Sequence, residues 1–434
     1  MEKYISKIKN REVASFDSIF DEIGRMCLKE IHDAVWVRFK TTLEYDDIIS
    51  ILKKEYNRVS SEDFEYIAKL GVGGFSRVIH VRKKSTGRQY AMKVQLKTAL
   101  LTNFEQDLTQ LNIEKNAFAC CRHPFIVNLA YAFQNQRYAI LVLDLSTVGD
   151  LQDMLNDLRR FDETSVRFYS AQIALAIAHL HDLEMIYRDL KPCNILLLED
   201  GYVQLADMGL VARYQSGPEA VKRTTIVGTK GYIAPEILNM NSSGYTNAVD
   251  YWSFGATMFK LFTGAKPFDS EDDCDNGEID VNKLYNNITD KELTIPEYVS
   301  NDGKNIITAL LAKDNKHRLG CSGGGVNDLK SHAFYSGIDW TKLLLKQLEP
   351  PFIPKVNTVP GKKCAFKNID SALESFHREF KDGRDWRSVP SKEGDENFAS
   401  WDFISPHSLK VEMGIAQEMI ALESDFKARK MMGS

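Results

Sequence analysis

The chain has 434 residues, of which 44% are hydrophobic and 26% charged, a composition typical of globular proteins. Its net charge of −5 argues against nucleic-acid binding, which usually leaves a basic footprint. The seven cysteines are scattered and form no CxxC pair, which favours reduced thiols over disulfides or metal ligands. We therefore expect a monomer in the cytoplasm.

The apolar pattern changes several times along the chain. Residues 1–60 follow a helical period, whereas the stretch from Phe64 to Leu96 predicts three strands separated by turns. Two more strands are expected in "FIVNLAYAF" and "RYAILVLDL", and long helical patterns dominate after residue 150. A β-rich region at 64–145 therefore precedes an α-rich region at 146–335.

The C-terminal hundred residues differ from the rest. Residues 336–403 are rich in Pro, Lys and aromatic residues and have little periodicity, which is typical of an extended tail on a globular core. Residues 404–434 are again an amphipathic helix. We expect this helix to form a small bundle with residues 1–60.

A glycine-rich stretch lies between the first two predicted strands. Small residues there let backbone N–H groups approach phosphate oxygens. Lys93 on the next strand can reach an α- or β-phosphate, and Glu114 on the following helix is placed to pair with it. The expected phosphate-binding stretch consists of Gly71, Val72, Gly73, Gly74, Phe75, Ser76, Arg77 and Val78.

The segment "YRDLKPCNILLLEDGYVQLADMGL" supplies the other groups of a phosphoryl-transfer centre. Asp189 can accept the proton of an attacking hydroxyl, and Lys191 can neutralise a γ-phosphate. Asn194 and Asp207 offer oxygen ligands to Mg²⁺. Each residue alone is commonly structural, but the ordered set with the glycine loop predicts a centre that uses ATP and Mg²⁺.

These motifs resemble those of eukaryotic protein kinases. The chain carries G-x-G-x-x-x-x-V, AMK, RDLKPxN, D-x-G, APE and D-x-W at residues 71–78, 91–93, 188–194, 207–209, 234–236 and 250–252. Ser76 and Met208 depart from the family pattern, but neither removes a charged group. The resemblance covers residues 64–335 and implies an active enzyme with an α+β, two-lobed fold. Lys191 and Thr229 indicate a serine/threonine type.

The same resemblance implies how the nucleotide is held. The adenine is expected between apolar side chains, against a hinge that follows a gatekeeper residue, and the ribose against an acid. These positions are Val78, Ala91 and Leu196 for the adenine, Leu143, Asp144 and Ser146 for the gatekeeper and hinge, and Asp150 for the ribose. Glu236 and Arg318 are expected to form a buried ion pair in the large lobe.

The motifs "YRDLKP" and "PPFIP" resemble the AGC group of kinases. Within this group, "DMGL", "GTKGYIAPEIL", "RLGC" and the C-terminal helix resemble G-protein-coupled receptor kinases. Residues 1–60 resemble only part of that family's regulator-of-G-protein-signalling homology domain, because they are too short for the complete domain. This resemblance implies activated seven-helix receptors as substrates and a location at the periphery of the plasma membrane. Cys193 and Lys260 replace two acids of basophilic relatives, which predicts tolerance of acidic substrates.

Two alternatives to this interpretation stay open. Thr225, four residues before Thr229, is placed like the phosphorylated activation threonine of other AGC kinases, which would make the chain a soluble kinase switched by phosphorylation. The other alternative is a weakly active scaffold that binds partners through its helical bundle. The charged and polar residues of the expected site are intact, which disfavours this alternative.

The segment "NFASWDF" also has two interpretations. Phe398, Trp401 and Phe403 either dock on the small lobe, as in AGC tails, or pack inside the terminal helical bundle. Asp402 lies where many AGC relatives carry a phosphorylatable residue, so it would supply a fixed negative charge.

Overall fold

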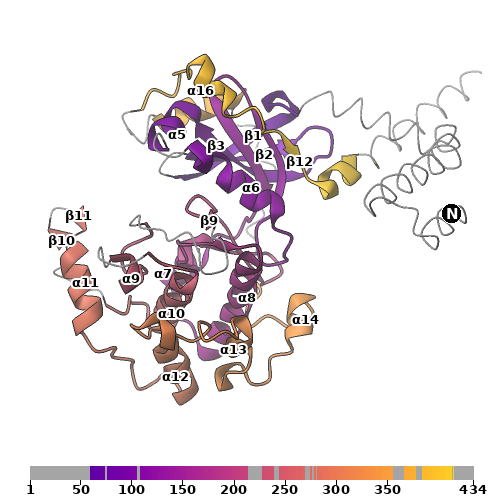
Figure 1. Ribbon diagram of the computed structural model, residues 1–434. Helices are drawn as coiled ribbons and strands as arrows, with labels where there is room; N and C mark the ends of the chain where they lie inside the picture. The colour runs from indigo at the N-terminus through magenta and orange to yellow at the C-terminus, as the bar shows by residue number, and fades with distance from the viewer. Residues whose placement is uncertain are drawn as a thin grey trace, which may run out of the picture. The chain divides into compact units, whose positions relative to one another are not determined.

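The computed structural model describes residues 59–73, 76–104, 108–213, 227–238, 244–268, 274–275, 278–279, 281–354, 366–377, 384–412 and 414. The chain divides into two compact units, Met1–Val59 and Ser60–Ser434, and the elements below all belong to the second (Figure 1). The predicted bundle of residues 1–60 and 404–434 lies almost wholly outside the described residues. Within the described part of the chain, no helix is long and apolar enough to cross a membrane.

The small lobe is an antiparallel six-stranded sheet with strand order β1-β2-β3-β5-β4-β12. Strand β5 is buried along nearly all its length because it lies between β3 and β4. The last strand comes from the far C-terminal end of the described chain and pairs with β4 at the sheet edge. The strands are β1 Phe64–Val72, β2 Ser76–Lys83, β3 Gln89–Leu96, β4 Leu129–Gln134, β5 Tyr138–Asp144 and β12 Phe403–Ile404.

Between β3 and β4 the chain forms α5 Lys97–Asn103 and α6 Ile113–Cys120, joined in part by the short helix η3 Leu108–Asn112. Helix α6 packs against β4 and buries the side chains of Glu114 and Phe118. It therefore presents an acidic side chain to the sheet from a buried position.

The large lobe is mostly helical. Its helices are α7 Leu151–Leu158, α8 Glu163–Asp182, α9 Pro235–Leu238, α10 Ala248–Thr263, α11 Val281–Asp290, α12 Asn301–Leu310, α13 Val326–Lys330 and α14 Trp340–Leu344. Short antiparallel pairs join β6 Met185–Ile186 to β9 Ala212–Arg213, β7 Ile195–Leu197 to β8 Val203–Leu205, and β10 Cys274–Asp275 to β11 Glu278–Ile279. This sheet-rich small lobe and helical large lobe confirm the predicted α+β two-lobed fold.

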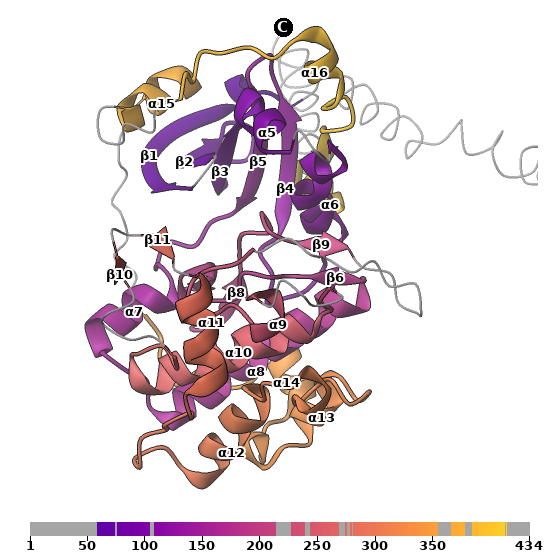
Figure 2. The same ribbon diagram turned by 60° about the vertical axis from the view of Figure 1, so that its left-hand side comes forward.

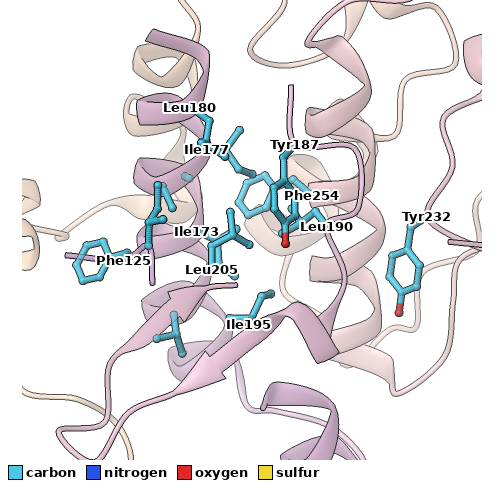
Figure 3. Packing of buried hydrophobic residues seen from close by; sticks show 14 of the residues in the cluster. Phe125, Ile173, Ile177, Leu180, Tyr187, Leu190, Ile195, Leu205, Tyr232 and Phe254 are labelled. Carbon is cyan, nitrogen blue, oxygen red and sulfur yellow. The ribbon is translucent and has the colours of Figure 1, made fainter. Parts of the chain in front are cut away.

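Helices α8 and α10 form the centre of the large lobe. Ile173, Ile177 and Leu180 recur at helical spacing on α8 and point toward Tyr187 and Phe254 (Figure 3). All five are at most 2% exposed. Burying one such apolar side chain contributes about 1.5–3 kcal/mol, so this contact fixes the loop that follows β6.

The C-terminal tail returns to the small lobe after residue 354. Helix α15, Ile369–His377, packs on β1 and β2, and α16, Lys392–Glu396, packs on α5 (Figure 2). Lys69 Nζ donates to the carbonyl oxygen of Ser375 at 3.3 Å. The small lobe is thus covered by segments that lie about 300 residues away in the sequence.

Candidate active site

A cavity of about 650 Å³ lies between the small sheet and the large lobe. Most of the expected nucleotide and metal residues line it, namely Gly71, Val72, Gly73, Ser76, Val78, Ala91, Lys93, Glu114, Leu143, Asp144, Ser146, Asp150, Asn194, Leu196 and Asp207. Gly74 and Phe75 lie outside the described residues. The structure therefore brings these nucleotide and metal residues to one cleft, whereas Asp189 and Lys191 are not among its lining residues. The roles of all of them in binding ATP and in transfer stay predictions.

The β1–β2 hairpin forms one wall of the cavity. Gly71 pairs with Val78, and Gly73 N donates to Ser76 O at 2.9 Å. A Cβ placed on Gly71 would meet no atom within 4 Å, so the space beside this backbone is open. An open, side-chain-free backbone is what close approach of a phosphate requires.

The side chain of Arg77 differs in direction from those of its neighbours in the expected phosphate-binding stretch. Its side chain does not line the cavity, because successive side chains of a strand point to opposite faces and those of Ser76, Val78 and His80 face inward. The Arg77 side chain is buried on the other face, where it donates to Ser76 O at 2.9 Å. Its guanidinium lies 4.8 Å from the ring centroid of Trp386 in the tail.

Lys93 is held between two carboxylates. Its Nζ donates to Glu114 Oε1 at 2.6 Å and to Asp207 Oδ1 at 2.8 Å. Burial alone would lower the pKa of Lys93, but the two carboxylates outweigh it and raise that pKa. Lys93 likewise lowers the pKa of Asp207, whereas burial raises the pKa of Glu114. The arrangement keeps a positive charge fixed above the metal-ligand candidate Asp207.

The catalytic candidate Asp189 accepts hydrogen bonds from three side chains. Thr229 Oγ1 donates to its Oδ1 at 2.6 Å, and Lys191 Nζ donates to its Oδ2 at 2.7 Å. Asn194 Nδ2 donates to Asp189 Oδ2 at 3.0 Å and to the main-chain carbonyl oxygen of Asp189 at 2.8 Å. These bonds fix the orientation of the carboxylate, and they leave Asn194 Oδ1 as the atom suited to a metal ion.

A buried acid on α10 holds the loop that carries Asp189. Asp250 is fully buried and accepts from Tyr187 N and Arg188 N at 2.8 Å each. Arg188 and Asp207 both have positive φ, 69° and 52°, which non-glycine residues adopt at a cost of about 1–3 kcal/mol each. Such strain persists because the surrounding bonds determine the conformation.

The nucleotide side of the cleft ends at the hinge and α7. Asp150 Oδ1 accepts from Gln152 N and Asp153 N, at 2.8 and 2.9 Å, and so caps α7. The predicted contact of Asp150 with a ribose would therefore use its Oδ2. Burial raises the pKa of the Asp150 carboxyl and, likewise, that of Asp144 at the hinge.

The residues present fit Mg²⁺ in complex with a nucleotide. No group of three or more His, Cys, Asp or Glu suited to a metal occurs among the described residues. Magnesium, however, commonly takes one or two protein oxygens and completes its shell with phosphates and water. Asn194 and Asp207 supply such oxygens on adjacent walls of the cavity.

Outside the cleft, the predicted Glu236–Arg318 ion pair is confirmed. Arg318 Nη1 donates to Glu236 Oε1 at 2.6 Å and its Nη2 donates to Oε2 at 3.0 Å. The Arg318 side chain is fully buried, and this two-bond geometry is the one in which guanidinium and carboxylate interact most strongly.

The tail aromatics dock on the small lobe. Phe398 and Trp401 are fully buried, and Trp401 Nε1 donates to Ile140 O on β5 at 3.1 Å. Lys97 Nζ lies 4.9 Å from the centroid of the Phe398 ring. Of the two open interpretations, the structure supports docking.

The two regulatory candidates are not tested by this contact. Asp402 is exposed beside it, and Thr225 lies outside the described residues, so the regulatory roles of both stay predictions.

Sequence reasoning missed several residues of the cavity wall. They include Leu70, His80, Val127, Leu145, Gly149 and Ala206. Alternation along β2 could have indicated His80, two residues after Val78. Leu70 lies near the end of β1, and the others come from loops whose course depends on tertiary packing.

A sheet-rich lobe, a lysine clamped between two acids, and an aspartate held on an adjacent loop together define a protein kinase. The family model for the protein kinase domain matches residues 64–335, so the chain belongs to this family. The comparisons also confirm the predicted enzyme class, an ATP-dependent serine/threonine kinase domain of AGC type.

Curated relatives carry the names of several kinases. The chain is 39% identical over 303 residues to a RAC family serine/threonine-protein kinase homolog from Dictyostelium discoideum, covering 70% of this chain and 64% of the relative. It is 35% identical over 364 residues to a putative ribosomal protein S6 kinase alpha-1 from Caenorhabditis elegans, covering 82% and 43%. The chain thus spans less than two thirds of these relatives. Their names do not support the resemblance to G-protein-coupled receptor kinases.

Proposed function

We propose that this chain transfers the γ-phosphoryl group of ATP to serine or threonine side chains of proteins. The observation that carries the proposal is Lys93, whose Nζ lies 2.6 Å from Glu114 Oε1 and 2.8 Å from Asp207 Oδ1. A cation fixed in this way is positioned to hold ATP phosphates, and positioned charge is most of what phosphoryl transfer requires.

The side chains have distinct roles in this proposal. Asp189 orients the substrate hydroxyl and accepts its proton as the oxygen bonds to the γ-phosphorus. The bond from that phosphorus to the bridging oxygen breaks, and ADP leaves. Lys191 neutralises charge on the transferred group. Asn194 and Asp207 would hold Mg²⁺, which when bound neutralises phosphate charge.

For the substrate, we propose tolerance of acidic sequence near the target residue. Cys193 lines the cleft one residue before Asn194, and Lys260 lies ten residues after Asp250 on α10. Basophilic AGC kinases have acids at these two positions, so an arginine of the substrate would meet a cation at Lys260. In its finer form, the proposal is that the substrates are activated seven-helix receptors. The enzyme would then act in the cytoplasm at the periphery of the plasma membrane.

The rival proposal is a soluble kinase that phosphorylation of Thr225 switches on. The names of the relatives favour this proposal, because neither of the two relatives compared above is named a receptor kinase. Arg188, the expected partner of a phosphate there, already donates to Leu210 O at 2.6 Å and to Tyr245 Oη at 2.9 Å.

A positional-scanning peptide library with Mg²⁺ and labelled ATP separates these proposals. The wild-type chain is expected to favour acidic residues around Ser or Thr, with Asp189→Asn inactive as the control. Selection of arginine two or three residues before the target would contradict the acidic preference and favour the soluble basophilic kinase. Activity that appears only after phosphorylation of Thr225 would establish the switch.

A further inference from the structure

We propose that Gln95 is a positioning residue for the Lys93–Glu114 ion pair. Its side-chain amide holds the second oxygen of the Glu114 carboxylate, so that the first stays aligned with Lys93. The inference rests on the proposed phosphoryl transfer, because it concerns the same lysine.

Strand β3 places the two donors together. Residues two apart on a strand share a face, so Lys93 and Gln95 both reach α6. Lys93 Nζ donates to Glu114 Oε1 at 2.6 Å, and Gln95 Nε2 donates to Glu114 Oε2 at 2.8 Å. The Glu114 side chain is only 7% exposed, so water cannot substitute freely for either donor.

The orientation of the Gln95 amide follows from this bond. Its Oε1 is buried and has no hydrogen-bond partner among the described residues. The reversed amide would set Oε1 against the Glu114 carboxylate, oxygen against oxygen. An unpaired buried carbonyl oxygen is unfavourable, and an apolar side chain would avoid it. The bond to the carboxylate offsets this cost, because charge-assisted hydrogen bonds are about twice as strong as neutral ones.

Among the described residues, Glu114 is the hydrogen-bond partner found for the Gln95 side chain. Its neighbours across the sheet are Ser76 on β2 and Ala139 on β5, neither of them charged. The charged groups around Glu114 are Lys93 and Asp207. Burial raises the pKa of Glu114, and the bonds from Lys93 and Gln95 oppose that rise, which favours the ionised carboxylate.

The substitution Gln95→Met tests the bond while preserving the length of the side chain. We expect kcat/KM for ATP to fall about tenfold, the effect of losing a hydrogen bond to a charged group. Gln347→Met, at an exposed position in the first part of the tail, serves as the matched control and should leave kcat/KM unchanged. Unchanged kcat/KM in Gln95→Met would overturn the inference.

A double-mutant cycle with Glu114→Gln separates positioning from packing. If Gln95 acts through Glu114, adding Gln95→Met to Glu114→Gln should lower kcat/KM by less than about threefold more. A second full tenfold loss would show that Gln95 acts independently of the ion pair and would overturn the inference.

The conservative variant Gln95→Glu adds a pH readout. Two adjacent carboxylates cannot both ionise easily, and one shared proton restores the bond to Glu114. The ratio of kcat/KM in the variant to wild type should therefore rise as pH falls from about 8 to about 6. A ratio that does not change with pH would contradict a direct contact.

Equilibrium ATP affinity keeps the two proposals distinguishable. A wild-type chain that binds ATP but transfers no phosphate contradicts the proposed function, whereas weaker ATP binding by Gln95→Met would still support positioning. A wild-type chain that transfers phosphate, with additive effects in the cycle, contradicts the inference alone.

Discussion

Thr229 closes a ring of hydrogen bonds around the catalytic candidate Asp189. Its Oγ1 donates to Asp189 Oδ1 and accepts from Lys191 Nζ, both at 2.6 Å, while Lys191 Nζ also donates to Asp189 Oδ2 at 2.7 Å. A hydroxyl is the group that can bridge a cation and an anion in this way, because it both donates and accepts.

We expect Thr229→Ala to lower kcat about 10- to 100-fold, since it removes a hydrogen bond to a charged group worth about 1.5–3 kcal/mol. Thr229→Ser retains the hydroxyl and should retain most of the activity. Steady-state kinetics of the two variants provide the measurement. An alanine variant with the kcat of wild type would show that the ring does not orient Asp189.

At the scale of elements, the loop before β4 is attached to α8 by a pair of histidines. The rings of His123 and His179 stack at 5.2 Å, and Nδ1 of His123 accepts from Phe125 N at 3.3 Å. Burial, with a smaller contribution from His179, lowers the pKa of His123 from its ordinary 6.5 to about 4. The His123 ring of the folded protein is therefore neutral above about pH 4.

This depressed pKa has a consequence for stability. Between about pH 6.5 and about pH 4 the unfolded chain binds a proton at His123 and the folded chain does not, so stability falls as pH decreases through that window. We expect His123→Asn to flatten this part of the curve of unfolding free energy against pH, measured by urea unfolding. Equal slopes in the variant and wild type would refute the assignment.

Docking of the tail is the second feature at this scale. Trp401 is fully buried between the tail and the small sheet. Trp401→Ala should lower the free energy of unfolding by about 3–5 kcal/mol, the usual cost of removing a buried aromatic side chain. Val389→Ala, 57% exposed in the same tail, is the control and should change it by less than about 0.5 kcal/mol. Similar effects of both substitutions, in denaturant unfolding, would mean that the aromatic contact contributes little.

At the scale of the whole molecule, the sequence allowed prediction of the two-lobed fold and of a coherent site. Ordered motifs such as those around Asp189 are local, so their spacing can be interpreted without a structure. The outward direction of the Arg77 side chain was not foreseen, because the whole stretch was assigned without regard to strand alternation.

Contacts between distant segments could not be predicted in the same way. Gln95 and Glu114 meet only because α6 packs across the sheet, and Trp401 contacts Ile140, 261 residues away. Which surface of the small lobe remains open for the tail depends on the packing of every other element. The two interpretations of the tail aromatics were therefore equal until the fold was known.

Transfer of labelled phosphate from ATP to a mixed serine- and threonine-containing protein substrate tests the central claim most directly. With Mg²⁺, the purified chain should label serine or threonine, and both chelation of the metal and Asp189→Asn should abolish the label while the variant still binds ATP. Labelling by Asp189→Asn at the wild-type rate would contradict the account, because Asp189 would then not serve the transfer. So would a wild-type chain that binds ATP and Mg²⁺ but labels no substrate, even after phosphorylation of Thr225.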